Sequence, residues 1–246
     1  MTRTFIRASL LVGAFTLVAH TASAQIVQSL NVNFGAFLPR GFDSRPAGDV
    51  LVADLTTGQP LLFDIGEFKG WTISGEWNVA LNNRIEVSGG VGYYNQKVNS
   101  LYRDLVNGHF TEDTSDDTEI EQRLSLRMVP LTAVVRFLPV GGASTFQPYV
   151  GAGVAVIPFR YSEVGDFVDT SDGAVFPARY ITSGTAVGPV ILGGLRMPLG
   201  GDIYSLTFEG RYQWASGDTG GTAAEFLGDK IDLSGGTVNF GFLVRF

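Results

Sequence analysis

Apolar and polar residues alternate along eight separate segments of the chain, which is the pattern of β-strands with two unlike faces. In one of them, residues 203–216, Leu206 and Phe208 fall on one face, and Thr207 and Glu209 fall on the other. The predicted strands are residues 28–39, 70–81, 84–96, 123–137, 147–162, 185–197, 203–216 and 233–246. No helical periodicity follows the first 24 residues, so the pattern predicts an all-β domain.

The connections between these strands alternate strictly between short and long. The long connections are residues 40–69, 97–122, 163–184 and 217–232. In an up-and-down meander, this order places every short turn at one end and every long loop at the other. Transmembrane β-barrels of bacterial outer membranes have this asymmetry, with the turns in the periplasm and the loops outside the cell.

Residues 1–24 have the three parts of a secretory signal peptide. Arg3 and Arg7 give a basic start, "ASLLVGAFTLVA" is a short apolar run, and residues 22–24 form an A-x-A cleavage site. We therefore expect an exported protein whose mature domain is 25–246. Without the two arginines, 15 of the 17 basic residues remain against 24 acidic ones, which argues against nucleic acid as a partner. The chain has no cysteine, so no disulfide is expected.

Alternation alone does not say which face points inward. In a soluble barrel the polar face would meet water, whereas in a membrane barrel the apolar face would meet lipid. Aromatic residues near the ends of the apolar rows favour lipid, because they suit the interfacial girdles of a bilayer. The predicted girdle residues are Trp71, Trp77, Tyr204, Tyr212, Trp214 and Phe246.

Hydrocarbon offers the backbone no hydrogen-bond partner, so strands that span a membrane must close into a ring. Eight is an even strand number and the smallest common size. We therefore predict an eight-stranded antiparallel up-and-down transmembrane β-barrel with short periplasmic turns and long extracellular loops. The alternative fold is a soluble periplasmic calyx of the lipocalin type, although "GWT" at residues 70–72 departs from the G-x-W pattern of that family.

Three segments resemble the small outer-membrane barrels typified by the membrane domain of OmpA, by OmpX and by OmpW. They are "QPYVGAGVAV" (147–156), "MVPLTAVVRF" (128–137) and the terminal "FGFLVRF". The resemblance implies a place in the outer membrane, contact with its lipid and lipopolysaccharide, and recognition of the last strand, ending in Phe246, by the barrel-assembly machinery. A monomer is expected. The OmpW family is also linked to the passage of small hydrophobic compounds.

The polar rows of such a barrel would point into the lumen. An eight-stranded barrel is just wide enough for its side chains to fill, and buried charges are costly unless they are paired. The favoured hypothesis is a salt-bridged plug, and the alternative is a narrow gated pore. Apolar Phe37 and Leu243 on the same rows could line a pocket for a hydrophobic compound or simply fill space. The predicted lumen network is Glu76, Glu86, Glu209, Arg136, Arg196, Arg211 and Arg245.

The long loops suggest surface contacts rather than chemistry. Residues 97–122 contain seven carboxylates, which form a solvated charge run or bridge divalent ions to lipopolysaccharide. The first loop contains "VLVADL" and "PLLFDIG", which are apolar enough to fold over the barrel mouth. After the signal peptide the chain has one histidine, His109, and it lacks nucleophile, nucleotide and metal motifs. We therefore expect no enzyme, no cofactor and no metal, and a role in envelope structure or in the passive passage of small solutes or hydrophobic compounds. Adhesion or ligand binding by the loops is the alternative.

Overall fold

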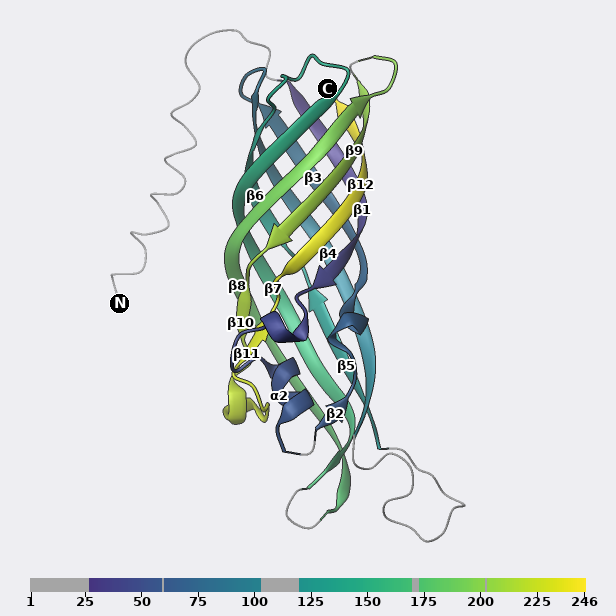
Figure 1. The fold of residues 1–246 in the computed structure, drawn as a ribbon, viewed down its shortest axis with the longest axis vertical. Helices are drawn as coiled ribbons and strands as arrows, with labels where there is room; N and C mark the ends of the chain where they lie inside the picture. Colours follow the sequence, from purple (N-terminus) through teal and green to yellow (C-terminus); the bar gives the residue numbers. More distant parts are fainter. Residues whose placement is uncertain (1–26, 59, 103–119, 170–172, 202) are drawn as a thin grey trace, which may run out of the picture.

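A computed structural model describes residues 27–58, 60–102, 120–169, 173–201 and 203–246. Its strands form a closed antiparallel ring with eight positions, which confirms the predicted barrel (Figure 1). The ring consists of β1 (Gln28–Pro39), β3 (Gly70–Ala80), β4 (Ile85–Tyr102), β5 (Glu121–Met128) continued by β6 (Leu131–Phe137), β7 (Gln147–Val168), β8 (Val175–Pro198), β9 (Tyr204–Gln213) and β12 (Gly235–Arg245). Because β1 pairs with both β12 and β3, the first and last strands close the ring.

The fourth predicted strand, residues 123–137, is interrupted. β5 ends at Met128 and β6 begins at Leu131, with Val129 and Pro130 between them. Proline has no N–H to donate to a ladder, which explains why regular pairing stops there. The backbone is still anchored on both sides, because Val129 N–H donates to the carbonyl of Pro158 and Gly92 N–H donates to that of Pro130.

The prediction of a long loop over residues 163–184 is wrong. β7 and β8 continue as a paired hairpin as far as the partners Val168 and Val175, and they contain 22 and 24 residues. About 9–11 residues are enough to cross a bilayer, so the two strands project beyond it. β4 likewise continues to Tyr102, past the predicted end at residue 96.

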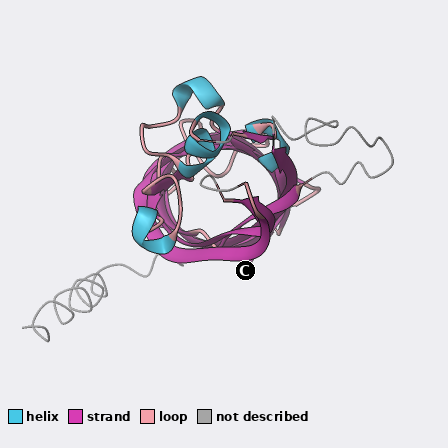
Figure 2. Ribbon diagram, turned by 90° about the horizontal axis from the view of Figure 1, so that it is seen from below, coloured by secondary structure: helices cyan, strands magenta, loops and turns pink. Residues whose placement is uncertain are grey.

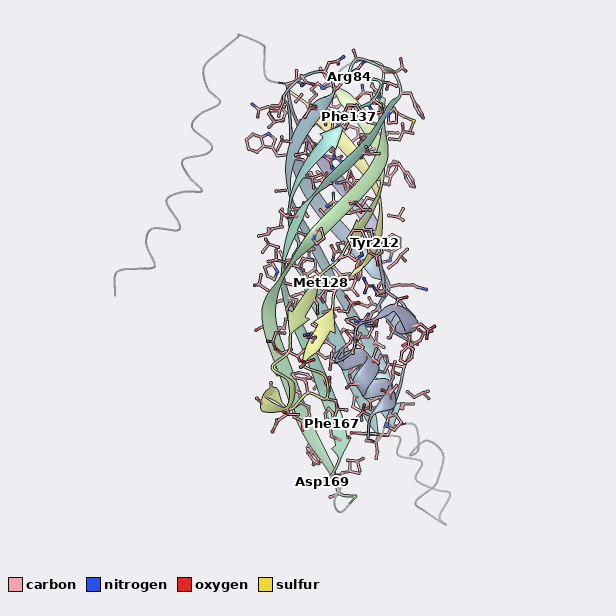
Figure 3. All side chains as sticks on the ribbon, turned by 60° about the vertical axis from the view of Figure 1, so that its left-hand side comes forward. Arg84, Met128, Phe137, Phe167, Asp169 and Tyr212 are labelled. Atoms are coloured by element: carbon pink, nitrogen blue, oxygen red, sulfur yellow. The ribbon has the colours of Figure 1, made fainter. Side chains whose placement is uncertain are left out.

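The two faces of the sheet exchange polarity along the strands. In the periplasmic half, Val135 of β6 is exposed on the outside while Arg136 is buried inside. In the extracellular half, Leu124 and Leu126 of β5 are buried inside while Arg127 is exposed on the outside. The periplasmic half, drawn at the top of Figures 1 and 3, is therefore a membrane barrel. The extracellular half, which we call the upper barrel although it is drawn at the bottom of these views, has the polarity of a water-soluble one. Figure 3 follows this axis from Arg84 and Phe137 at the periplasmic end, past Met128, to Phe167 and Asp169.

Two extracellular loops complete the upper barrel, where β1, β3, β9 and β12 end early (Figure 1). Figure 2 shows their helices gathered at the rim of the barrel. Among the described residues, no helix has the length and the apolar run needed to cross a membrane. Loop 1 (residues 40–69) contains η1 (Phe42–Ser44), α2 (Val50–Thr56), β2 (Leu61–Leu62) and η2 (Ile65–Phe68), and loop 4 (residues 214–234) contains β10 (Ser216–Asp218), η4 (Gly221–Ala224) and β11 (Lys230–Asp232).

The two loops share one apolar core with the inner face of the upper barrel. Leu51 and Phe68 of loop 1 and Phe226 of loop 4 are buried against inward residues such as Leu124 and Ile157. We call this assembly of loops 1 and 4 the cap. The apolar segments of the first loop thus fold over the barrel mouth as predicted, and they fill its interior.

Candidate functional site

The periplasmic half of the lumen contains a buried cluster of four charged side chains. Arg136 of β6 lies at its centre, with Nη2 2.6 Å from Oε2 of Glu76 and 2.9 Å from Oε2 of Glu209. Its Nη1 donates to the side-chain oxygen of Asn78. Arg211 is the fourth member: its Nη2 donates to Glu76 and, at 2.7 Å, to Oε1 of Glu209. Two arginines thus neutralise two glutamates across the lumen.

A second ion pair lies nearby. Arg196 of β8 makes a bidentate contact with Glu86 of β4, with both N···O distances at 2.8 Å. Tyr149 lies between the pair and the four-charge cluster. Its ring centroid is 5.3 Å from the guanidinium carbon of Arg136 and 6.0 Å from that of Arg196, and its hydroxyl donates to Glu209 at 3.1 Å. We call these six charged residues and Tyr149 the plug.

Six of the seven predicted lumen residues therefore come together in the plug. Arg245, the seventh, is half-buried near the periplasmic end of β12, and no described carboxylate lies within 4.0 Å of its side chain. The predicted lumen network did not include Asn78 and Tyr149, which also contact these charges. Asn78 shares the inward face of β3 with Glu76, so strand alternation is a signal that could have included it.

The predicted girdle residues lie on the outside of the barrel. Trp77, Tyr204 and Phe246 are exposed toward the periplasmic end, and Trp71 and Trp214 are exposed at the opposite border of the apolar belt. Tyr212 differs, since it is half-buried against Trp214, with ring centroids 4.6 Å apart, and lies 3.5 Å from Nε of Arg40. The outside is therefore apolar between two aromatic borders, as a bilayer requires.

Asp49 joins the two loops of the cap. It is fully buried, and its carboxylate accepts from Nε and Nη2 of Arg45 at 2.8 and 3.0 Å. It also accepts from the backbone N–H of Val52, which caps α2, and from that of Asp232 in loop 4 at 2.6 Å. Arg45 in turn donates to the carbonyl of Asp232 at 2.8 Å.

A second acidic site lies where α2 enters the upper barrel, above the membrane. Asp54 of α2 is buried near Glu163, which lies on the projecting part of β7, and the hydroxyl of Tyr161 is 3.4 Å from Oδ2 of Asp54. Burial, together with the neighbouring charge of Glu163, raises the pKa of Asp54 well above its ordinary value. Burial also raises the pKa of Glu163 to about 7. At least one of the two carboxyls therefore holds a proton in mildly acidic solution.

The cap is expected to dock more firmly at pH 5 than at pH 8. Both pKa values are raised in the folded state, so the released cap gives up protons first, and docking weakens as pH rises from about 4.5 to about 7. Hydrogen exchange of α2 amides, corrected for the intrinsic rate at each pH, measures the opening free energy. Asp54→Asn is expected to reduce this dependence, whereas Asp43→Asn, at an exposed site in the same loop, should leave it intact. Equal opening free energies at the two pH values would contradict the expectation.

No family model and no curated protein sequence match the chain. Solved structures do resemble it in fold. The outer membrane protein OprG from Pseudomonas aeruginosa has a TM-score of 0.52 at 15% identity, covering 90% of this chain and 96% of that one. Neisserial surface protein A has a TM-score of 0.45 at 13% identity, covering 89% of this chain and 97% of that one. A major outer membrane protein of Thermus thermophilus has a TM-score of 0.43 at 13% identity, covering 89% of this chain and 99% of that one. With its closed eight-stranded ring and its apolar outer belt, this chain has the fold of the small outer-membrane β-barrels.

Proposed function

We propose that this protein is a closed outer-membrane barrel with a role in envelope structure, and that it conducts neither ions nor water-soluble solutes. The observation that carries the proposal is the plug. Its four central charges come from β3, β6 and β9, which stand apart around the ring, so their ion pairs cross the lumen. In a barrel just wide enough for side chains, ion pairs that cross the lumen are expected to interrupt any path for water.

The gated pore is less well supported. Opening a path would separate buried ion pairs, and an unpaired buried charge costs several kcal/mol. Above the plug, the lumen is filled by the cap, so a solute would also have to displace Leu51, Phe68 and Phe226. Two independent obstacles therefore lie in series.

Planar bilayer recordings test the closed state. The wild-type protein is expected to insert without stepwise conductance at any moderate voltage. The pair Arg136→Ala and Glu76→Ala removes one charge of each sign together with their volume, and is expected to produce small discrete steps. Arg84→Ala, at an exposed periplasmic turn, serves as the control and should stay silent. Wild-type steps that change when Arg136 or Glu209 is neutralised would establish the pore and overturn the proposal.

A second candidate function is the passage of small apolar molecules sideways into the membrane. The interruption between β5 and β6 favours it, because Pro130 borders a pocket of about 50 Å³ that contacts both inward Glu76 and Arg211 and outward Val91 and Tyr93. The pocket is too small for a solute as it stands, and the cap fills the lumen between it and the extracellular side, so the cap would have to move before a molecule from outside reached it. Release of the cap, discussed below, is the test.

The other functional expectations stay predictions. Residues 103–119, which hold His109 and most of the acidic run, lie outside the described residues, so adhesion by that loop is untested. The signal peptide, the monomeric state and recognition of the last strand by the assembly machinery are also untested. Phe246 of that strand is exposed at the periplasmic end. The absence of enzymatic activity, of a cofactor and of a metal also remains an expectation.

A further inference from the structure

The outer surface of the upper barrel carries a group of basic side chains on one side only. All are exposed, and none forms an ion pair with a carboxylate in the part of the chain that the structure describes. The group, which we call the basic patch, consists of Lys97 on β4, Arg123 and Arg127 on β5, Arg160 on β7 and Arg179 on β8.

Two members of the patch face each other directly. Arg127 and Arg160 are register partners on adjacent strands, with both side chains on the outer face. Like charges opposite each other in a sheet destabilise it. On its other side, Arg127 pairs with Asn95 of β4, and Arg160 pairs with Ser183 of β8. Neither partner carries a negative charge. The fold therefore holds two arginines together without a described counter-charge, and an anion bound between them would relieve the repulsion.

The arginine pair lies just beyond the apolar belt. The last fully apolar row of register partners comprises Val91, Leu131, Val156 and Val187. The row with Arg127 and Arg160 is four residues further out on every strand, about 13 Å along the strands and about 10 Å along the membrane normal at a tilt of about 40°. Tyr93 marks the border between them. Tyr93 is two residues beyond the apolar row, so the pair lies about 5 Å past this border along the membrane normal, within a headgroup layer that is about 5–8 Å thick.

An apolar groove leads from the belt to this pair. It runs along the lipid-facing side of β1, β3 and β4, where it is lined by Phe34, Trp71, Ile73 and Tyr93, and it ends at Asn95. Asn95 is the register partner of Arg127. An acyl chain in the groove would therefore carry its headgroup to the basic patch.

We propose that the patch and the groove together form a binding site for a phosphorylated glycolipid of the outer leaflet, namely the lipid A part of lipopolysaccharide. Arg127 and Arg160 hold one phosphate, since each guanidinium group can donate two parallel hydrogen bonds to phosphate oxygens. Lys97 lies diagonally across from Arg127, within reach of the same headgroup. The groove beside them takes one acyl chain. This site is independent of whether the lumen conducts.

Binding of purified lipid A to the folded protein in neutral detergent, followed by native mass spectrometry, tests the site. The pair Arg127→Gln and Arg160→Gln is expected to weaken binding of bisphosphorylated lipid A at least about tenfold, because each lost charged hydrogen bond accounts for about that factor. Arg84→Gln, which removes an exposed arginine at the periplasmic end, should bind like wild type. A gel shift on heating confirms that every variant is folded.

Two further probes separate the sources of the signal. Lipid A without phosphates should bind the wild-type protein and the double variant equally weakly. Inorganic phosphate should not compete at millimolar concentration, because it lacks the acyl chain that occupies the groove. Equal binding of bisphosphorylated lipid A by wild type and double variant would overturn the site, and full competition by inorganic phosphate would overturn the lipid assignment.

Discussion

Replacing Arg136 by methionine is expected to lower the free energy of unfolding by about 3–5 kcal/mol, because it leaves buried charge uncompensated. Glu76 and Glu209 would retain only Arg211 between them, and Asn78 would lose its donor. Urea unfolding in phospholipid vesicles, followed by tryptophan fluorescence, measures the loss. Arg84→Met, exposed at the periplasmic turn, should change stability by less than about 0.5 kcal/mol.

The reason for the loss can itself be tested. If uncompensated charge causes it, replacing all four members of the cluster by apolar residues of similar volume should restore most of the stability, since buried ion networks often contribute little net free energy. A loss below about 1 kcal/mol for Arg136→Met would show that the cluster is hydrated. In that case the closed state would also lose its support.

Replacing Asp49 by alanine is expected to release the cap. The change removes the acceptor of four donors, leaves Arg45 buried without a carboxylate, and removes the N-cap of α2. Breaking a buried ion pair costs about 3–5 kcal/mol, so the opening free energy of the cap should fall by that order. Hydrogen exchange over residues 50–56 measures it. Asp43→Ala, in the same loop but exposed, should retain the wild-type protection.

The same variant tests the second candidate function. Once the cap is released, the apolar inner faces of β4, β5 and β7 become accessible, and a small fluorescent apolar probe should bind there and transfer to the membrane. Wild type should bind the probe much more weakly. If Asp49→Ala exposes α2 and the probe still does not bind, passage of apolar molecules through this barrel is ruled out.

Much of the barrel could be predicted from the sequence because membrane strands must alternate. β1 has the predicted bounds, and the inward placement of Glu76, Arg136 and Glu209 follows from the parity of each strand. The projecting part of the β7–β8 hairpin was missed because its outer face mixes polar residues, such as Asp166 and Arg179, with apolar Val164 and Ile181, so the regular alternation of a membrane strand is lost. Inward aromatic positions at Phe167 and Tyr180 were nevertheless present in the missed part.

The contacts inside the plug were less accessible to sequence reasoning. Alternation assigns a face but not a register, and register decides which inward charges meet. Arg196 meets Glu86 across the lumen, whereas Arg245, on the same kind of inward row, lies at the end of its strand with no described carboxylate within 4.0 Å of its side chain. Partners from β3, β6 and β9 meet only because the ring closes, and closure is a property of the whole sheet.

The exchange of polarity along the strands also fixes how deeply the molecule is immersed. A push toward the periplasm would drag Arg127 and Arg160 into hydrocarbon, where each cationic group costs up to about 2–4 kcal/mol at the midplane. A push outward would lift the row of Val91, Leu131 and Val187 into water. The outward side chains of the strands therefore fix a single insertion depth for the barrel, and this depth does not depend on what the extracellular loops bind.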